Sequence, residues 1–260
     1  LLRQFNQAAL DESVHVFAPA TTVRFRQNAG AAGNSGGAVT GSGENPPVGV
    51  SIPFYLKDAP TGPVTLKILR QRNSTFEDVR TYTLGTTPGT GSGRASGGRR
   101  RAGGATTALK GANTFTWDLR YPGANVIPGA VFQGQAGGPL AAPGHYRVDL
   151  TVGGRTYSQP FDLVKDPRLT YTDADLEEQF QFMKKVSDRL EQTMATVRRI
   201  RDLRKHAEDL VAQTKKDGRD PAALDRALKA LNDVLYPIEE RLVQFRARAG
   251  QDLLNYPTGI

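Results

Sequence analysis

The hydrophobic period of this chain changes abruptly near residue 170, and this change constrains the fold more than any other feature. Before Asp166-Pro167-Arg168, short runs alternate between apolar and polar residues and are separated by Gly and Pro clusters. After it, apolar residues recur every three or four positions through most of the remaining sequence. The first pattern is typical of half-buried strands and the second of amphipathic helices. The sequence therefore predicts an α+β chain of two modules.

The first module, residues 14–168, is predicted to be an antiparallel β-sandwich of the Ig-like or FN3-like kind. Seven or so short strands are separated by turns at the spacing usual for such folds. Residues 50–56 alternate most clearly, but Pro53 cannot donate to a β-ladder, which predicts an edge strand or a bulge there. Gly153-Gly154 predicts a two-residue hairpin turn.

Two low-complexity insertions interrupt this module, near residues 27–47 and 85–111. Both are rich in Gly, Ala, Ser and Thr and hold few large apolar side chains. Such segments bury too little surface to offset their ordering entropy, so we expect both to be disordered loops.

The single tryptophan has two interpretations. Trp117 falls on the same strand face as Phe115 and Leu119, which favours a core residue, with Asp118 pointing outward. The alternative is a carbohydrate platform formed by an aromatic ring beside an acid. The periodicity favours the core interpretation.

The second module, residues 169–260, is predicted to be a long helical hairpin. Thr172 is placed to cap a helix of about 40 residues, roughly 60 Å long. Asp217-Gly218 ends this helix and Asp220-Pro221 begins a second one, so the short connection predicts antiparallel packing. Pro237 is expected to kink the second helix or divide it in two. A dimerising coiled coil is the less favoured alternative.

The two helices are unequal in length, so the start of the first helix needs another partner. Charged residues four positions apart predict weak ion pairs along the helices. These pairs are Arg198 with Asp202, Arg204 with Glu208, and Asp225 with Lys229.

The net charge of +8 raises the question of nucleic-acid binding. Residues 1–170 carry 18 Lys/Arg and 10 Asp/Glu, whereas residues 171–260 carry 16 of each. Much of the excess lies in one loop around Arg99-Arg100-Arg101, which has no aromatic side chain for base stacking. A solvated loop is therefore favoured, and no nucleic-acid partner is predicted.

No catalytic, cofactor-binding or metal-binding residue is predicted. The chain has no cysteine, and its three histidines, His15, His145 and His206, have no second histidine or acid at ligand spacing. No serine stands in a Ser/His/Asp arrangement. Asn73-Ser74-Thr75 is a formal glycosylation acceptor that we interpret as a polar turn. No apolar run reaches the roughly 20 residues that a membrane-spanning helix needs.

Several short runs carry a family resemblance, of which Trp117-Asp118-Leu119-Arg120-Tyr121-Pro122-Gly123 and Lys165-Asp166-Pro167-Arg168 are the most specific. The chain resembles the C-terminal region of secreted bacterial proteins built on a sortilin-type, BNR-repeat β-propeller, often labelled glycosyl hydrolase or exo-sialidase-like. The other runs are Leu1-Leu2-Arg3-Gln4, His15-Val16-Phe17, Phe54-Tyr55-Leu56-Lys57, Pro143-Gly144-His145-Tyr146 and Gly250-Gln251-Asp252.

The resemblance implies that residues 1–13 are the tail of a preceding propeller, followed by an Ig-like sandwich and a helical segment. It also implies an extracellular or periplasmic location and the protein's own propeller as a partner. The chain has no Ser-x-Asp-x-Gly-x-x-Trp box and no blade repeat, so no sialidase-type catalytic residue can be assigned here. A third helical segment expected after Tyr256-Pro257 is also missing.

These observations predict a non-catalytic accessory or interaction module of an exported β-propeller protein. The alternative is a carbohydrate-binding or cell-surface adhesion module that uses the loops between Tyr121 and Gly144. Nucleic-acid binding through the Arg-rich loop is the third and least favoured hypothesis. A protein partner is compatible with the first two.

Overall fold

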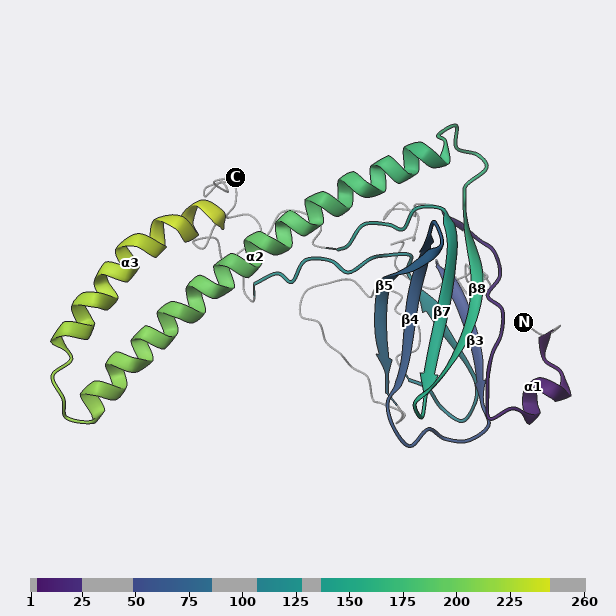
Figure 1. The fold of residues 1–260 in the computed structure, drawn as a ribbon, viewed down its shortest axis with the longest axis horizontal. Helices are drawn as coiled ribbons and strands as arrows, with labels where there is room; N and C mark the ends of the chain where they lie inside the picture. The colour runs from purple at the N-terminus through teal and green to yellow at the C-terminus, as the bar shows by residue number, and fades with distance from the viewer. Residues whose placement is uncertain (1–3, 25–48, 86–106, 128–136, 244–260) are drawn as a thin grey trace, which may run out of the picture. The chain divides into compact units, whose positions relative to one another are not determined.

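The computed structural model describes residues 4–24, 49–85, 107–127 and 137–243 (Figure 1). The chain has α+β content, with strands first and two helices after them. The predicted insertions at 27–47 and 85–111 fall largely outside these residues. The elements are α1 (Gln7–Asp11), β1 (Val14–Val16), β2 (Thr22–Arg24), β3 (Val50–Leu56), β4 (Val64–Arg72), β5 (Thr75–Leu84), β6 (Gly111–Trp117), β7 (Gly144–Val152), β8 (Arg155–Lys165), α2 (Asp173–Lys216) and α3 (Ala222–Leu242).

The described residues fall into two compact units, whose boundary lies inside the long helix α2. The first unit comprises Leu1–Pro122 and Leu140–Gln181. The second comprises Gly123–Pro139 and Phe182–Ile260. All strands and the first turns of α2 therefore belong to one unit, and the rest of α2 belongs with α3.

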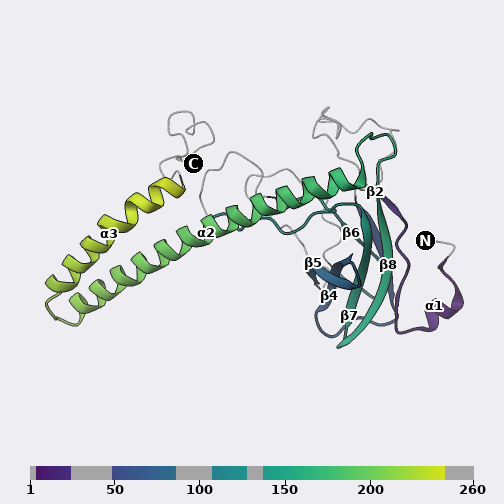
Figure 2. The same cartoon turned by 45° about the horizontal axis from the view of Figure 1, so that its top comes forward.

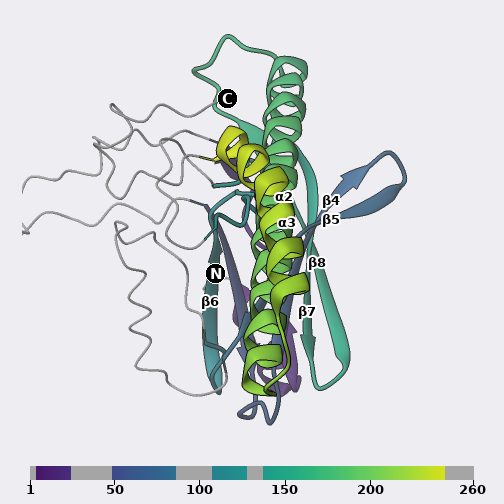
Figure 3. The same ribbon diagram turned by 90° about the vertical axis from the view of Figure 1, so that its left-hand side faces the viewer.

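The strands of the first unit form two sheets. One has the order β1-β3-β6 and the other the order β2-β8-β7-β4-β5. All neighbours are antiparallel except β2 and β8, which are parallel. Figure 2 shows the strands in a tilted view, and Figure 3 shows β6 on one side and β7 and β8 on the other, so the two sheets form two layers.

One hydrophobic core joins the inward faces of both sheets. Trp117 is fully buried, and its ring lies 5.4 Å from that of Tyr146 and 6.2 Å from that of Phe161. Phe115 and Leu119 are also buried, so the core interpretation of Trp117 is confirmed. The alternation along the strands thus gives each sheet one apolar face, and the two faces bury each other.

Pro53 differs from its prediction as an edge or bulge residue, because β3 is the central strand of its sheet. The ladder between β1 and β3 covers only Phe54 to Leu56. Beyond it, Phe17 donates its N–H to the carbonyl of Pro53, over 3.0 Å. The missing N–H of Pro53 therefore faces the β1 side, where the β1 ladder ends.

Glycine is required at two turns. Gly153 and Gly154 have φ values of 55° and 81°, which confirms the predicted hairpin turn between β7 and β8. Gly49 has φ 131° and packs directly against β6, since a Cβ there would lie 2.0 Å from the carbonyl oxygen of Trp117.

Helix α2 begins with the predicted cap and is 44 residues long. The Thr172 hydroxyl accepts from the N–H of Asp175, and the Asp175 carboxylate accepts from the N–H of Thr172, which is a reciprocal capping box. Gly218, with φ 69°, stands just after the helix and lets the chain turn. Both terminal predictions for this helix are confirmed.

Helix α3 runs from Ala222 to Leu242 without interruption, so the expected division at Pro237 is wrong. Pro237 leaves the carbonyl of Asp233 without its usual helical donor. Both residues lie on the exposed side of α3, where water can hydrate that carbonyl.

The Gly49 contact makes a direct stability prediction. Gly49→Ala should lower the free energy of unfolding by roughly 3 kcal/mol or more, because both the positive φ and the Trp117 carbonyl oppose a Cβ. Gly62→Ala is the matched control, since a Cβ there meets no atom within 4 Å. Its effect should stay within about 0.5 kcal/mol. Urea unfolding of both variants measures the difference, and equal stabilities would contradict the prediction.

Candidate functional site

Two of the three histidines lie beside an acid. His145 lies opposite Asp162 in the β7–β8 register, with Nδ1 2.6 Å from the carboxylate. His15 lies 2.9 Å from Glu12. His206 is exposed on α2. No group of three His, Cys, Asp or Glu that could hold a metal ion exists among the residues that the structure describes.

Two other sequence motifs serve local structure. The Asp118 carboxylate accepts from the N–H of Arg120, over 3.1 Å, and so stabilises the turn after β6. Asn73 has φ 53° in the turn between β4 and β5, which agrees with the polar-turn interpretation. Arg99-Arg100-Arg101 lies outside the described residues.

Tyr121, expected to be an exposed contact for a glycan, is instead packed inside the first unit. Its ring lies 4.7 Å from that of Phe180 on α2. Burial raises the pKa of Tyr121, and the nearby Arg70 charge offsets part of this increase. Tyr121 is thus partly buried against α2 at the start of the loops considered for carbohydrate binding.

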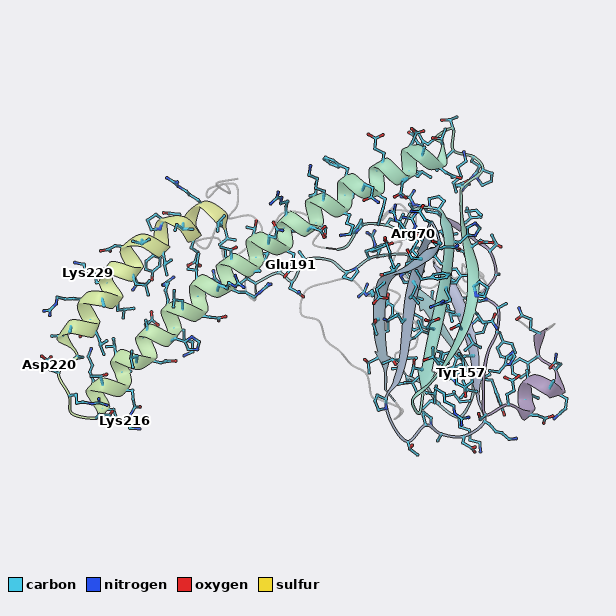
Figure 4. The ribbon with its side chains drawn as sticks, in the orientation of Figure 1. Arg70, Tyr157, Glu191, Lys216, Asp220 and Lys229 are labelled. Atoms are coloured by element: carbon cyan, nitrogen blue, oxygen red, sulfur yellow. The ribbon has the colours of Figure 1, made fainter. Side chains whose placement is uncertain are left out.

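The most developed polar cluster in the described residues centres on Arg70, near the end of β4 (Figure 4). Arg70 is 7% exposed and lies next to the first turns of α2 within the first unit. Its Nη2 donates to the carbonyl of Pro143 over 3.1 Å and to the Glu177 carboxylate over 2.7 Å. A buried guanidinium is therefore paired with a helix carboxylate.

Aromatic rings enclose the rest of the Arg70 guanidinium. Its Cζ lies 5.8 Å from the Tyr146 ring centroid and 5.4 Å from that of Phe180. Nε and Nη1 are buried without a hydrogen-bond partner. Ring faces stabilise such a cation electrostatically, although less well than an acceptor would. The Arg70 cluster thus joins a strand, a helix and two aromatic rings.

Neighbouring side chains extend this contact between α2 and the strands. Arg72 pairs with the other oxygen of Glu177. Arg24, on β2, donates to the carbonyl of Ala141 over 2.8 Å and to the side chain of Gln179 over 3.2 Å. Two arginines thus share one carboxylate, and a third also reaches the helix.

The electrostatics of Glu177 follow from these partners. Burial alone would raise its pKa, but hydrogen bonds from Arg70, Gln181 and Arg72 together with the Arg70 charge lower the pKa to about 2. Glu177 therefore stays ionised at neutral pH. A permanently ionised carboxylate that is shared by two arginines is suited to holding α2 in place and not to proton transfer.

The sequence contained a signal for Arg70 that the prediction missed. Val64, Leu66 and Ile68 point inward along β4, and the same alternation places Arg70 inward. A charged residue at an inward position requires a buried partner. Glu177 follows the buried Leu176 in the first turns of α2, at the place where such a partner is needed.

The second unit contains its own buried acid. Glu239 on α3 is 3% exposed and accepts from Arg201 over 2.7 Å and from Arg204 over 2.9 Å. Arg204 also donates to Asn232 and lies over the ring of Tyr236. This ionic cluster fixes the register of α3 along α2.

The ion pairs predicted four residues apart are replaced by longer-range ones. Arg198 pairs with Glu191, whose carboxylate also accepts from the N–H of Asn125. Arg204 pairs with Glu239, and Asp225 with Lys215. The three predicted pairs are therefore not formed. Arg204 and Asp225 pair with residues of the other helix, and Arg198 pairs with Glu191 seven residues away on α2.

Large apolar side chains remain exposed on the second unit. Val234 is 62% exposed and Leu210 is 55% exposed. We define the 203–238 face as the apolar surface formed by Leu203, Ala207 and Leu210 of α2 together with Ala227, Ala230, Val234 and Ile238 of α3. Further along α2, Phe182, Met183 and Val186 are also exposed.

The α2–α3 core itself is small. Ile127, Met194, Val197 and Val243 form its buried cluster. A contiguous exposed apolar surface is typical of an interaction site. No helix in the described ranges is long and apolar enough to cross a lipid bilayer.

Compared with the models of known protein families and with curated protein sequences, the chain matches none of them.

The Arg70 cluster predicts an acid-dependent loss of stability. Glu177→Gln should lower the free energy of unfolding by about 2–3 kcal/mol at neutral pH, because Arg70 stays buried without its counter-charge. The folded-state pKa is lowered, so the contribution of Glu177 is complete above the unfolded pKa and is lost as the pH falls. The difference between wild type and variant should shrink from about pH 4.5 to about pH 2.

Chemical unfolding at several pH values measures this difference. Glu178→Gln is the matched control on the same turn, since Glu178 is exposed and makes none of the Arg70 contacts. Its effect should be within about 0.5 kcal/mol at every pH. A Glu177→Gln effect that persists undiminished at the acid end would contradict the ionic origin.

Proposed function

We propose that this chain is a non-catalytic accessory and interaction module of an exported β-propeller protein. In this proposal the first unit is an Ig-like β-sandwich and the second contains a long antiparallel helical hairpin. The sandwich fixes the first helix, and the hairpin presents a surface for association. The location is extracellular or periplasmic, and one partner is the protein's own propeller.

The Ig-like assignment is supported by Tyr146 near the start of β7. Its hydroxyl donates to the carbonyl of Ala142, four residues upstream, over 2.6 Å. Immunoglobulin-type sandwiches contain a tyrosine corner of this kind, in which a tyrosine near a strand start bonds back to the preceding backbone. The crossing from β5 in one sheet to β6 in the other and back to β7 is the connectivity expected of such a sandwich.

The hairpin assignment is supported by pairs at both ends of α3. Arg201 pairs with Glu239, and Lys215 pairs with Asp225, so the residue numbers rise on one helix as they fall on the other. Such a pattern requires antiparallel helices. The five-residue connection between α2 and α3 is short enough for that arrangement.

One observation carries the non-catalytic proposal: the buried charged groups of the described residues are engaged in structural contacts, whereas most of the exposed large apolar side chains lie on α2 and α3. Arg70 and Glu177 attach a helix, and Arg204 and Glu239 attach another. Catalysis would need a perturbed acid or base facing a substrate. Association needs exposed apolar surface, and the 203–238 face supplies it.

The proposal predicts that the pure chain has no glycosidase activity. Aryl-sialoside and aryl-glycoside panels measure this, with a bacterial sialidase as the positive control for the substrates. Turnover by the pure chain that survives repurification would overturn the proposal.

Binding to the propeller provides the positive test. The chain should be retained by the propeller of its own full-length protein in a pull-down. Glu177→Gln, which loosens α2, should reduce retention severalfold, whereas Glu178→Gln should leave it unchanged. Absence of retention by the wild-type chain, or retention only by unrelated polysaccharides, would contradict the proposed partner.

A further inference from the structure

The 203–238 face lies on one side of the α2–α3 pair. Successive residues of a helix are about 100° apart, so Leu203 and Leu210 stand about a quarter turn from the side of α2 that contacts α3. Val234 and Ile238 stand about a quarter turn from the side of α3 that contacts α2. The direction of rotation about the helix axis is the same as for Leu203 and Leu210 on α2. For antiparallel helices, these two displacements point to the same side of the pair.

The opposite side of the pair is polar. Arg201 and Tyr236 are displaced the other way, toward the ionic cluster with Glu239. The helices therefore separate an ionic side from an apolar side. The apolar side carries exposed aliphatic side chains, among them Leu203, which is 50% exposed.

We propose that the 203–238 face binds the same face of a second copy of this chain, in an antiparallel four-helix arrangement. This inference rests on the proposed role of the helical hairpin as an interaction surface. It commits to one occupant because the residues of the face are complementary to themselves when one copy is turned end to end.

The self-complementarity follows from where large and small residues lie along the helices. On α2, Leu203 and Leu210 flank Ala207. When α2 is laid antiparallel on its own copy, Ala207 faces Ala207 and each Leu203 falls beside a Leu210. The alanine contact lets the two helices approach to roughly 8–10 Å.

Helix α3 is complementary in the same arrangement. Its bulky residues, Val234 and Ile238, lie near its end, and its small ones, Ala227 and Ala230, lie nearer its start. The pairs between α2 and α3 place Ala230 and Val234 on either side of the level of Ala207. When one copy is reversed, Ile238 of one α3 therefore lies against Ala227 of the other, and Val234 lies beside Ala230. The larger side chains fill the space that two facing alanines would leave open.

A parallel pairing of the same faces is less favourable. It would bring Leu203 of one copy onto Val234 and Ile238 of the other, bulky against bulky. It would also gather the exposed Arg199 and Arg241 of both copies at one end, where like charges repel.

Sedimentation of the full 260-residue chain over a wide concentration range tests the pairing. The wild type should be a dimer in equilibrium with monomer. Leu203→Glu and Val234→Glu should each weaken the dimer by roughly tenfold or more, because a carboxylate would be buried without a partner. Phe182→Glu is the matched control, since Phe182 is 65% exposed on α2 outside the face, and it should leave the dimer unchanged.

Circular dichroism establishes that each variant is folded. Val234 is highly exposed in the single chain, so Val234→Glu provides the test even if Leu203→Glu unfolds the helices. A wild type that stays monomeric at every concentration would overturn the inference. A dimer that resists both glutamate variants would overturn it as well.

Cysteine cross-linking reports the antiparallel register, and the chain contributes no cysteine of its own. Oxidised Ala207→Cys should form a covalent dimer, because the two residues meet at the symmetry axis. Ala223→Cys, near the start of α3, should not, since its counterpart lies at the opposite end of the paired helices. A folded dimer in which Ala207→Cys stays reduced would overturn the antiparallel pairing.

These outcomes are independent of the test of the proposed function. Glycoside turnover by the pure chain would overturn the non-catalytic role whatever the oligomeric state. A monomeric wild type would overturn the self-pairing, and the propeller pull-down would still decide the accessory role.

Discussion

The buried guanidinium of Arg70 is the group on which the attachment of α2 to the sheets depends. An arginine that is 7% exposed is strongly destabilising without a counter-charge, and among the described residues α2 supplies it through Glu177. Tyr146 and Phe180 exclude water from the cation and so strengthen its pairing with the carboxylate. Helix formation, packing of the aromatic rings and ion pairing are therefore coupled, because each requires the helix to begin where the Thr172–Asp175 capping box places it.

The second unit also contains a buried charge that needs a counter-charge, but there the buried group is a carboxylate. Glu239 is the buried charge there, and Arg201 and Arg204 supply the counter-charge from the facing helix. A buried ion pair contributes little net stability compared with apolar residues, but it penalises any other register, because a shift by one turn would leave Glu239 unpaired. The ionic side of α2 and α3 therefore determines how the helices align, and the apolar side stays available for association.

Much of the fold could be predicted from the sequence, for physical reasons that also explain the errors. Alternation around Trp117 and the Gly153-Gly154 turn depend on local periodicity and backbone freedom, which the sequence displays directly. Contacts between distant segments leave no such local pattern in the sequence. The pairing of Arg70 with Glu177 joins residues more than a hundred positions apart, and the pairing of His145 with Asp162 depends on the β7–β8 register. Tyr121 was assigned to an exposed loop because no local pattern indicates that Phe180 covers it.

The apolar surface that two packed helices can bury is limited, and the stripe on α3 exceeds this limit. Each helix can bury only the side that faces its neighbour, so an apolar stripe wider than that side must remain exposed or meet a third element. On α3, Leu231 and Leu235 face α2, while Val234 and Ile238 continue the apolar surface past the contact. The stripe is thus wider than a two-helix contact needs, and its width matches the helices of a four-helix bundle, which bury two neighbouring sides. The excess width argues that α2 and α3 reach their full burial only in an assembly.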